Sequence, residues 1–346
     1  MPAIETHALR KVYPAPPPPK RRGRRVVPAG AGMGAAVPAG PPAPSAVGSG
    51  EIVALKGLDL EVREGEFFGL LGPNGAGKTT SIGILTTRVR PTSGTAIVGG
   101  ASVTTDAVRV RQRIGVVPQR PNPDRSLNVI ENLLYHAAYF GIARSVSEPR
   151  ANALLEQLGI ADKALAKVDE MSGGQQQRLM IARALIHEPQ VIFLDEPTVG
   201  LDPQTRLSLW EILRGLHAEG RTIVMTTHYM DEADKLCDRI AIVDRGELLE
   251  LDTPGALKSR APGGTLVEIT LGDDAGAVLD EVRALEGVLR AEAHGALLRV
   301  FSNSGGRVIS PVIQVADDRG IGVKNVSLTE PSLETLFVSL TGRKLD

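Results

Sequence analysis

The sequence contains little cysteine and few aromatic residues. Cys237 is the one cysteine among 346 residues, and Phe, Trp and Tyr together make up 3%. A single cysteine excludes an internal disulfide framework and is typical of a reducing compartment. We expect Cys237 to be a small buried apolar residue, because nothing in its neighbourhood supports a reactive thiol.

The chain also lacks long apolar runs and a strong net charge. It has no run of eighteen apolar residues, and its first residues contain no signal-like apolar core, so we expect that it does not cross a membrane itself. The formal net charge is −1, which excludes a field strong enough to draw nucleic acid or anionic lipid to the whole molecule. The length predicts two domains.

Residues 14–50 contain no acidic residue, and proline and glycine occupy 17 of the 37 positions. Such a segment cannot bury enough apolar surface to offset the entropy lost on ordering, so we predict a disordered insertion. It follows residues 1–13, whose last part predicts an edge strand. Residues 20–25 carry five positive charges, which leaves −6 for the remainder. This basic run could contact anionic lipid headgroups or RNA, although a solvated tether is favoured.

A phosphate-binding loop is predicted at residues 72–80. The apolar residues 67–71 indicate a buried strand, and residues 81–85 can begin a helix. Glycines at 72, 75 and 77 allow successive amides to face a phosphate, and the helix start adds further donors. Lys78 can reach the β- and γ-phosphates, and the Thr79 hydroxyl can bind Mg²⁺. The alternative is a glycine-rich turn without a ligand, which the strand and helix context disfavours.

Strand and helix patterns alternate after this loop. Residues 191–194 and 222–225 are continuous apolar runs, as expected for parallel strands buried on both faces, and residues 95–98 and 114–117 predict further strands. Between about 125 and 187 the pattern is helical, with a capping box at Asn128 and Glu131. Asp202 caps a helix that Pro203 begins. This alternation predicts an α/β core.

Polar side chains follow the predicted strands. Asp195 and Glu196 come directly after residues 191–194, which places them at the carboxyl edge of the sheet, where α/β proteins bind ligands. There Asp195 could hold Mg²⁺, and Glu196 could accept a proton from attacking water. Gln119 could offer its amide to metal or water, and His228 could donate to the γ-phosphate. An acidic helix cap is the alternative for the carboxylates.

A second anion-receptive helix start is predicted at residues 171–178. Ser172 and Gln175 form a capping box, and Gly173 and Gly174 allow close backbone approach. An ordinary capped helix would explain the same residues. Because this cradle contains no lysine or metal ligand, it makes more sense closing over a nucleotide that another chain holds. The histidines at 136 and 217 are expected to be structural.

The C-terminal residues 261–346 predict a separate accessory unit. Strands are expected at 266–271, 288–290, 297–301 and 321–328, with helices at 277–285, 307–316 and 332–340. The βαββαβ order is that of a ferredoxin-like α+β domain. Its regular packing residues offer no chemistry, so its expected role is interaction or dimer support.

Together these motifs resemble the ATP-binding subunit of an ABC transporter over about residues 51–258. The resemblance implies a P-loop NTPase cassette at 51–260, with a RecA-like core, an antiparallel β subdomain and a helical subdomain. Its cofactors would be ATP and Mg²⁺. The implied nucleotide-binding residues are Tyr13 (A-loop), Gly72, Pro73, Asn74, Gly75, Ala76, Gly77, Lys78, Thr79 and Thr80 (Walker A), Ser172, Gly173, Gly174 and Gln175 (signature), and Asp202 (D-loop). The implied catalytic residues are Lys78, Gln119 (Q-loop), Glu196 (Walker B) and His228 (switch), and the implied metal ligands are Thr79, Gln119 and Asp195.

The resemblance also implies partners. A second nucleotide-binding subunit, expected to be another copy, would close its signature over the ATP. The end of the chain resembles drug-resistance-type exporter ATPases that serve ABC-2 permeases. This implies a cytoplasmic position beneath a separate permease, export of a drug, lipid or polysaccharide-like substrate, and no specific nucleic acid partner.

Two alternatives remain besides a transport ATPase. A soluble ATPase acting on ribosomes or DNA would usually carry two cassettes or long coiled coils, whereas this chain has one cassette and about fifty residues between Gln119 and the signature. A degraded regulatory subunit is disfavoured by Glu196 and His228. Two departures from the family pattern are Met171 in place of leucine and the insertion that separates Tyr13 from the next strand.

Overall fold

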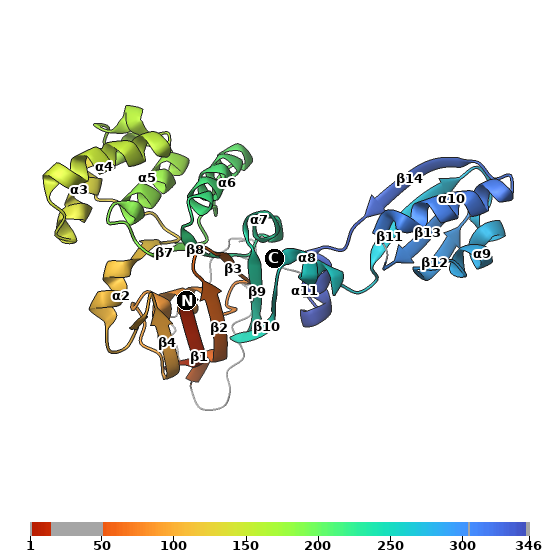
Figure 1. Ribbon diagram of the computed structural model, residues 1–346, viewed down its shortest axis with the longest axis horizontal. Helices are drawn as coiled ribbons and strands as arrows, with labels where there is room; N and C mark the ends of the chain where they lie inside the picture. Colours follow the sequence, from red (N-terminus) through yellow and green to blue (C-terminus); the bar gives the residue numbers. More distant parts are fainter. Residues whose placement is uncertain (1, 15–50, 304, 344–346) are drawn as a thin grey trace, which may run out of the picture.

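The computed structural model of the chain describes residues 2–14, 51–303 and 305–343. Within these residues the strands form three sheets, two in the larger part of the molecule and one in a small C-terminal part (Figure 1). Apart from Pro14, the insertion predicted at 14–50 lies outside the described residues.

The central sheet has the strand order β10-β9-β3-β8-β7-β6. Neighbouring strands are parallel from β9 to β6, and β10 pairs antiparallel to β9 at one edge. The predicted α/β core is therefore confirmed. The strands are β3 (Phe67–Leu71), β6 (Ile114–Val117), β7 (Val191–Asp195), β8 (Thr222–Thr227), β9 (Arg239–Asp244) and β10 (Glu247–Asp252).

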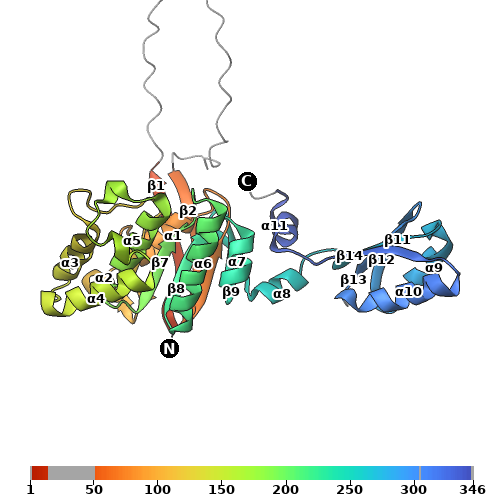
Figure 2. The ribbon, with the colours of Figure 1, turned by 90° about the horizontal axis from the view of Figure 1, so that it is seen from above.

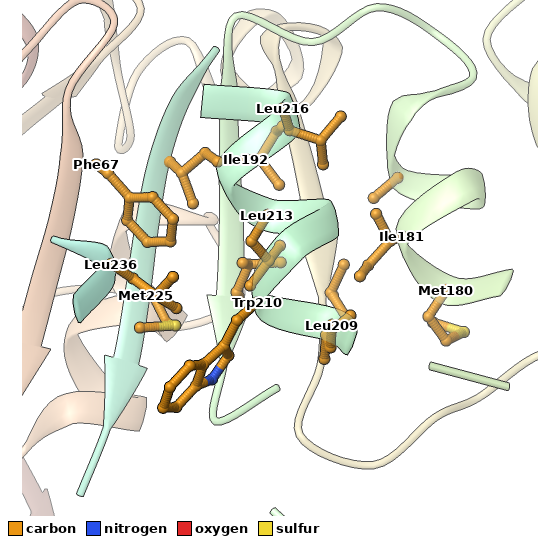
Figure 3. Packing of buried hydrophobic residues seen from close by; sticks show 14 of the residues in the cluster. Phe67, Met180, Ile181, Ile192, Leu209, Trp210, Leu213, Leu216, Met225 and Leu236 are labelled. Atoms are coloured by element: carbon orange, nitrogen blue, oxygen red, sulfur yellow. The ribbon is translucent and has the colours of Figure 1, made fainter. Parts of the chain in front are cut away.

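Alternate residues of the central strands face two different cores. Phe67 and Ile192 belong to the core beneath the helical layer, whereas Phe68 and Phe193 belong to the core on the opposite face. Both faces of the sheet are therefore buried, which explains why these strands are continuous apolar runs. Figure 3 shows Leu213 and Leu216 of one covering helix, α6 (Pro203–Ala218), beside Ile192.

An antiparallel sheet covers the second core, with α1 (Lys78–Leu85) packed between the two sheets. Its strand order is β2-β1-β4-β5, so β1 is not the predicted edge strand. The prediction was wrong for the strand as a whole because β1 pairs on both sides as far as Arg10: Ile4 lies opposite Val62 on β2 and Val98 on β4. Among the described residues, those of β1 after Arg10 pair with β2 alone. The strands are β1 (Pro2–Pro14), β2 (Glu51–Arg63), β4 (Ser93–Val98) and β5 (Ala101–Ser102).

Three helices of the larger part begin where the sequence predicts caps. The capping boxes at Asn128 and Ser172 are both formed, and Asp202 caps α6 with Pro203 in its first turn. The helices are α1 (Lys78–Leu85), α2 (Ala107–Arg113), α3 (Val129–Tyr139), α4 (Arg144–Gln157), α5 (Gly173–Leu185), α6 (Pro203–Ala218), α7 (Met230–Leu236) and α8 (Pro254–Ser259), with 3₁₀ turns η1 (Ala161–Lys163) and η2 (Val168–Glu170). Helices α3, α4 and α5 pack on one another as a helical layer (Figure 1).

The small C-terminal sheet has the order β12-β13-β11-β14, and every neighbouring pair is antiparallel. With its helices this is the ferredoxin-like arrangement predicted from the βαββαβ order. Its core is a separate cluster that includes Val267, Val300 and Val312. The elements are β11 (Thr265–Leu271), η3 (Ala275–Val278), α9 (Leu279–Arg283), β12 (Val288–His294), β13 (Leu297–Ser302), η4 (Gly305–Val308), α10 (Ile309–Asp318) and β14 (Val323–Thr329).

The last helix, α11 (Leu333–Thr341), does not belong to the small sheet, although the sequence placed it in the C-terminal unit. It packs against α7 and α8 (Figure 2). Leu333, Leu336 and Phe337 are buried in the core beneath the helical layer, and Arg343 Nη2 lies 2.5 Å from Asp244 Oδ1. The assignment failed because an amphipathic pattern shows that a face is buried, but not against what.

No helix in the described ranges is long and apolar enough to cross a bilayer.

Candidate functional site

The phosphate loop connects β3 to α1, as the sequence predicts. A Cβ atom at Gly72 would lie 2.2 Å from the carbonyl oxygen of Val243 on the neighbouring strand, so any side chain there would clash with backbone. Gly77 has a φ of 106° and would meet Ala54 O at 2.7 Å. These two positions require glycine because the loop runs against strands β9 and β2. Asn74, Gly75 and Thr79 are exposed, and Thr80 is half-buried.

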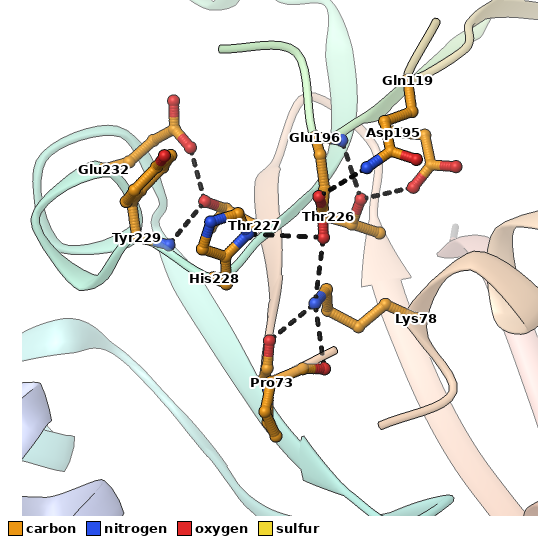
Figure 4. Close-up of polar contacts among 11 residues, drawn as sticks. Pro73, Lys78, Gln119, Asp195, Glu196, Thr226, Thr227, His228, Tyr229 and Glu232 are labelled. Carbon is orange, nitrogen blue, oxygen red and sulfur yellow. Dashed lines mark hydrogen bonds and ion pairs between the residues drawn. The ribbon is translucent and has the colours of Figure 1, made fainter. Parts of the chain in front are cut away.

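Lys78 lies at the start of α1 and points back under the loop (Figure 4). Its Nζ donates to Gly72 O at 2.6 Å and to Pro73 O at 3.2 Å, and lies 3.1 Å from Glu196 Oε1. Burial lowers the pKa of Lys78, and the nearby Glu196 carboxylate opposes this effect. The ammonium group therefore fills a buried position between carbonyl oxygens and a carboxylate, where phosphate oxygens would be suitable partners.

Glu196 follows β7 and is the centre of the polar cluster in Figure 4. Its φ of 48° is unusual for a residue other than glycine, and such strained residues concentrate at functional sites. Its Oε2 accepts from Gln119 Nε2 at 2.9 Å, and its Oε1 lies 3.5 Å from His228 Nδ1. The structure thus brings together Lys78, Gln119, Glu196 and His228 from four separate segments.

Thr226 of β8 holds both residues of the acidic pair. Its hydroxyl donates to Asp195 Oδ1 at 2.7 Å and accepts from the Glu196 amide at 3.0 Å. Thr226 is not among the site residues predicted from the sequence. A signal was present, because Thr226 and Thr227 are polar residues at the end of an otherwise apolar buried strand.

The predicted metal ligands have suitable chemistry for Mg²⁺. Asp195 offers a carboxylate, Thr79 a hydroxyl and Gln119 an amide, all of them oxygen donors of the kind that hard divalent cations prefer. Asp195 uses Oδ1 for Thr226, and no hydrogen bond within the described ranges engages its Oδ2. One carboxylate oxygen is therefore left for a metal or its bound water.

The signature residues lie at the start of α5 and do not join this cluster. Ser172 and Gln175 bond to each other, and across the described part of the chain no hydrogen bond or ion pair links residues 172–175 to the phosphate loop. Gly174 packs against α6, since a Cβ there would lie 2.3 Å from Thr205 Cγ2. Asp202 accepts from the Thr205 amide and hydroxyl. Hydrogen bonds to Thr205 lower the pKa of Asp202.

Tyr13 lies at the end of β1, opposite Ile52 of β2. Pro14 pairs with Glu51, so the residues on either side of 15–50 are neighbours in the sheet, and Tyr13 keeps its place there. Lys11 Nζ lies 4.8 Å from the centre of the Tyr13 ring. The tyrosine ring is half-buried and part of its surface is open to a ligand.

The residues expected to be structural are packed as such. Cys237 is buried against Gly69, and burial raises the pKa of its thiol. His217 bonds to Gly65 O at 3.0 Å. His136 lies in an aromatic cluster with Phe140 and His187, where burial lowers its pKa to about 4.

Comparison with known proteins identifies the family. Residues 55–199 match the family model described as ABC transporter. The chain is 36% identical over 298 residues to the linearmycin resistance ATP-binding protein LnrL of Bacillus subtilis, covering 86% of this chain and 96% of that protein. It is 41% identical to the Nod factor export ATP-binding protein I of Burkholderia orbicola (86% and 94% covered) and 38% identical to the doxorubicin resistance ATP-binding protein DrrA of Mycobacterium tuberculosis (85% and 90%).

Solved structures agree. The dimeric structure of MJ0796, described as a bacterial ABC transporter cassette, is similar with a TM-score of 0.58 and 27% identity, covering 72% of this chain and 98% of that one. A post-hydrolysis structure of the same cassette, described as bound to ADP and Pi, gives a TM-score of 0.57 and 28% identity. The predicted cassette fold is confirmed.

These findings decide between the classes of function considered from the sequence. The prediction of an ATPase that serves an export system is confirmed, and the ribosome- or DNA-acting alternative is not supported. The chain belongs to the ABC transporter family, as an ATP-binding subunit.

Proposed function

We propose that two copies of this chain close over Mg²⁺-ATP and hydrolyse it, and that this drives export of a drug, lipid or polysaccharide-like substrate through a separate ABC-2 permease. The observation that carries the proposal is the convergence of Lys78, Gln119 and His228 on the buried carboxylate of Glu196. One carboxylate with an ammonium, an amide and an imidazole around it is suited to activating a water beside a phosphate.

In this mechanism Lys78 exchanges its contacts to Gly72 O and Pro73 O for oxygens of the β- and γ-phosphates. The amides of the loop and of the first turn of α1 supply further donors. Losing the Lys78 contact frees Glu196 to accept a proton from water aligned with the γ-phosphate. His228 and Lys78 then stabilise the charge that develops during transfer.

Magnesium, when bound, would neutralise phosphate charge. Asp195, Thr79 and Gln119 are the residues that would hold it. The hydrogen bond from Thr226 to Asp195 fixes the orientation of that carboxylate, as second-shell partners do at metal sites. Gln119 also bonds to Glu196, so its position responds to both the metal and the base.

Pairing of two copies is supported by the exposed signature turn. Ser172 and Gly173 are exposed at the start of α5, and the helix start offers unpaired amides. The similar MJ0796 cassette is described as a dimer. In the pair, Ser172 and Gly174 would donate to the γ-phosphate held by the other copy.

A permease contact is supported by the outer surface of the helical layer. Tyr135 and Tyr139 on α3 are 65% and 83% exposed, although large aromatic side chains are usually buried. Beside them is a pocket of about 290 Å³, lined by Glu131, Leu134, Tyr135, Ala138, Ile142, Arg144 and Ser147. We propose that this surface receives a segment of the permease, which would hold the chain at the cytoplasmic face of the membrane.

The test compares Glu196→Gln with Glu247→Gln, an exposed residue that pairs with Lys56. The first variant should bind ATP, lose about 100-fold or more of its phosphate release and accumulate as a dimer by light scattering. The second should match the parent. Normal turnover in Glu196→Gln would contradict the proposed base, and a monomer with Mg²⁺-ATP, with and without the permease, would contradict the paired mechanism.

A further inference from the structure

We propose that Glu232 is a positioning residue for ATP hydrolysis, which fixes the chain on both sides of His228. The proposal rests on the role given above to His228 and extends it to a buried carboxylate outside the nucleotide site. Glu232 lies in α7 and its side chain is fully buried, at 0% exposed. It has no part in the mechanism as described so far.

Two donors from different elements hold the Glu232 carboxylate, and Figure 4 shows one of them, the Thr227 hydroxyl. The Thr227 hydroxyl at the end of β8 donates to Oε2 at 2.5 Å, and the indole Nε1 of Trp210 in α6 donates to Oε1 at 3.0 Å. Asp202 caps helix α6, whose first turn packs through Thr205 against Gly174 at the signature start of α5. Glu232 therefore joins α6, α7 and the end of β8 at one point.

The contact with Thr227 controls the backbone around His228. Thr227 precedes His228, and its hydroxyl also accepts from the amide of Tyr229, which follows His228, at 2.9 Å. The Thr227 hydroxyl thus links the residue before His228 to the residue after it. Because this hydroxyl donates to Glu232, Glu232 determines the direction of the hydroxyl proton. The His228 ring packs on Tyr229 with 4.2 Å between the ring centres, and its Nδ1 faces Glu196.

A purely structural role does not account well for this carboxylate. Burial of a carboxyl group costs stability, and well-packed apolar side chains can replace buried polar groups without loss. Burial raises the pKa of Glu232, and the hydroxyls of Thr227 and Thr198 and the Trp210 indole oppose this effect. The presence of a carboxylate at position 232 is explained if the Thr227 hydroxyl must be held in one orientation, because the carboxylate accepts the proton of that hydroxyl.

The experiment is a double-mutant cycle between Glu232→Gln and His228→Ala, read as kcat and KM for ATP. Glutamine keeps the shape but cannot accept from both donors through its amide nitrogen. We expect Glu232→Gln to lower kcat by about 10- to 100-fold through misplacement of His228, with KM within about twofold. In the His228→Ala background it should cause no further loss, because the histidine that it positions is gone.

Each outcome is decisive. An active Glu232→Gln beside an inactive His228→Ala would overturn the positioning role alone, and so would independent, multiplicative losses. An active His228→Ala would overturn both the positioning role and the proposed role of His228. If Glu232→Gln does not fold, Thr227→Ser and Thr227→Val replace it: serine, which keeps the hydroxyl, should retain kcat, and valine should show the loss. Equal kcat in these two variants would contradict the proposal.

Discussion

Lys78 and Glu196 form a buried ion pair, with 3.1 Å between Nζ and Oε1 and both side chains at most 5% exposed. The pair joins the start of α1 to the end of β7. Each buried charge therefore depends on the other for compensation. In the proposed mechanism, ATP replaces this contact when it binds.

Replacing Lys78 by alanine should therefore reduce stability as well as abolish ATP binding. It leaves Glu196 buried without its cation, which costs about 3–5 kcal/mol in typical buried pairs. Lys78→Ala combined with Glu196→Gln should recover part of the free energy of unfolding, measured by urea denaturation, but not the ATP binding. The control is Lys56→Ala, which breaks an exposed pair and should cost less than about 1 kcal/mol. Equal stability of Lys78→Ala and the parent would contradict the coupling.

The close packing of Gly174 on Thr205 predicts that alanine is tolerated less well at position 174 than at position 173. Gly174→Ala should lower the free energy of unfolding by about 1–3 kcal/mol, because its Cβ would overlap Thr205 Cγ2. Gly173→Ala is the matched control, since a Cβ there meets nothing within 4 Å. Adding Thr205→Ser to Gly174→Ala removes the clashing methyl but keeps the hydroxyl on Asp202, and should restore stability. Equal stability of the two single alanine variants would show that the clash is absent.

The position of α11 predicts where a C-terminal change will be felt. Phe337 is 0% exposed in the cassette core, so Phe337→Ala should destabilise by about 3–5 kcal/mol. Hydrogen exchange should accelerate in α7 and α8 but not in β11, β12 and β13. Leu340→Ala, at a position 39% exposed, is the control and should have a small effect. Faster exchange confined to the small sheet would place the helix there instead.

The low pKa of His136 predicts a loss of stability in acid. Burial, with Arg183 and His187 nearby, lowers this pKa to about 4 from the ordinary histidine value of 6.5. The unfolded chain therefore binds a proton on His136 more readily than the folded chain does. The contribution of neutral His136 to the free energy of unfolding is complete above pH 6.5 and is lost as the pH falls towards 4. Between pH 7 and 5 the parent should lose about 1–2 kcal/mol more than His136→Gln. Parallel unfolding curves for the two proteins at both pH values would contradict this.

The sequence was sufficient to predict the elements that depend on residue type or on residues close by in the chain. The strand before the phosphate loop, the capping boxes at Asn128 and Ser172 and the placement of polar residues after buried strands all follow from local pattern, and the structure contains each of them. Glu196, Gln119 and His228 could be expected to meet because parallel strands end at one edge of a sheet.

The sequence was insufficient where distant segments choose between partners. Nothing in residues 3–13 shows that a second strand, β4, will pair on the other side of β1. The apolar face of α11 fits the small sheet or the cassette equally well, and only the assembled core decides. Thr226 and Glu232 bond to partners that are far from them in the sequence, Asp195 and Trp210. The end of an apolar strand draws attention to Thr226, but no local pattern shows which partner either residue will meet.

The contact between α8 and α11 means that the chain leaves the cassette and returns to almost the same place, with the ferredoxin-like unit carried in between. In the chain order, that unit is an insertion between two helices of the cassette and not a C-terminal extension. A truncation after α8 would remove Phe337 from the core. An internal deletion of the ferredoxin-like unit, with α8 joined to α11 by a short linker, would leave the last helix packed on the cassette. Truncation and internal deletion are therefore different experiments, and only the internal deletion measures what the ferredoxin-like unit itself contributes to the activity of the protein.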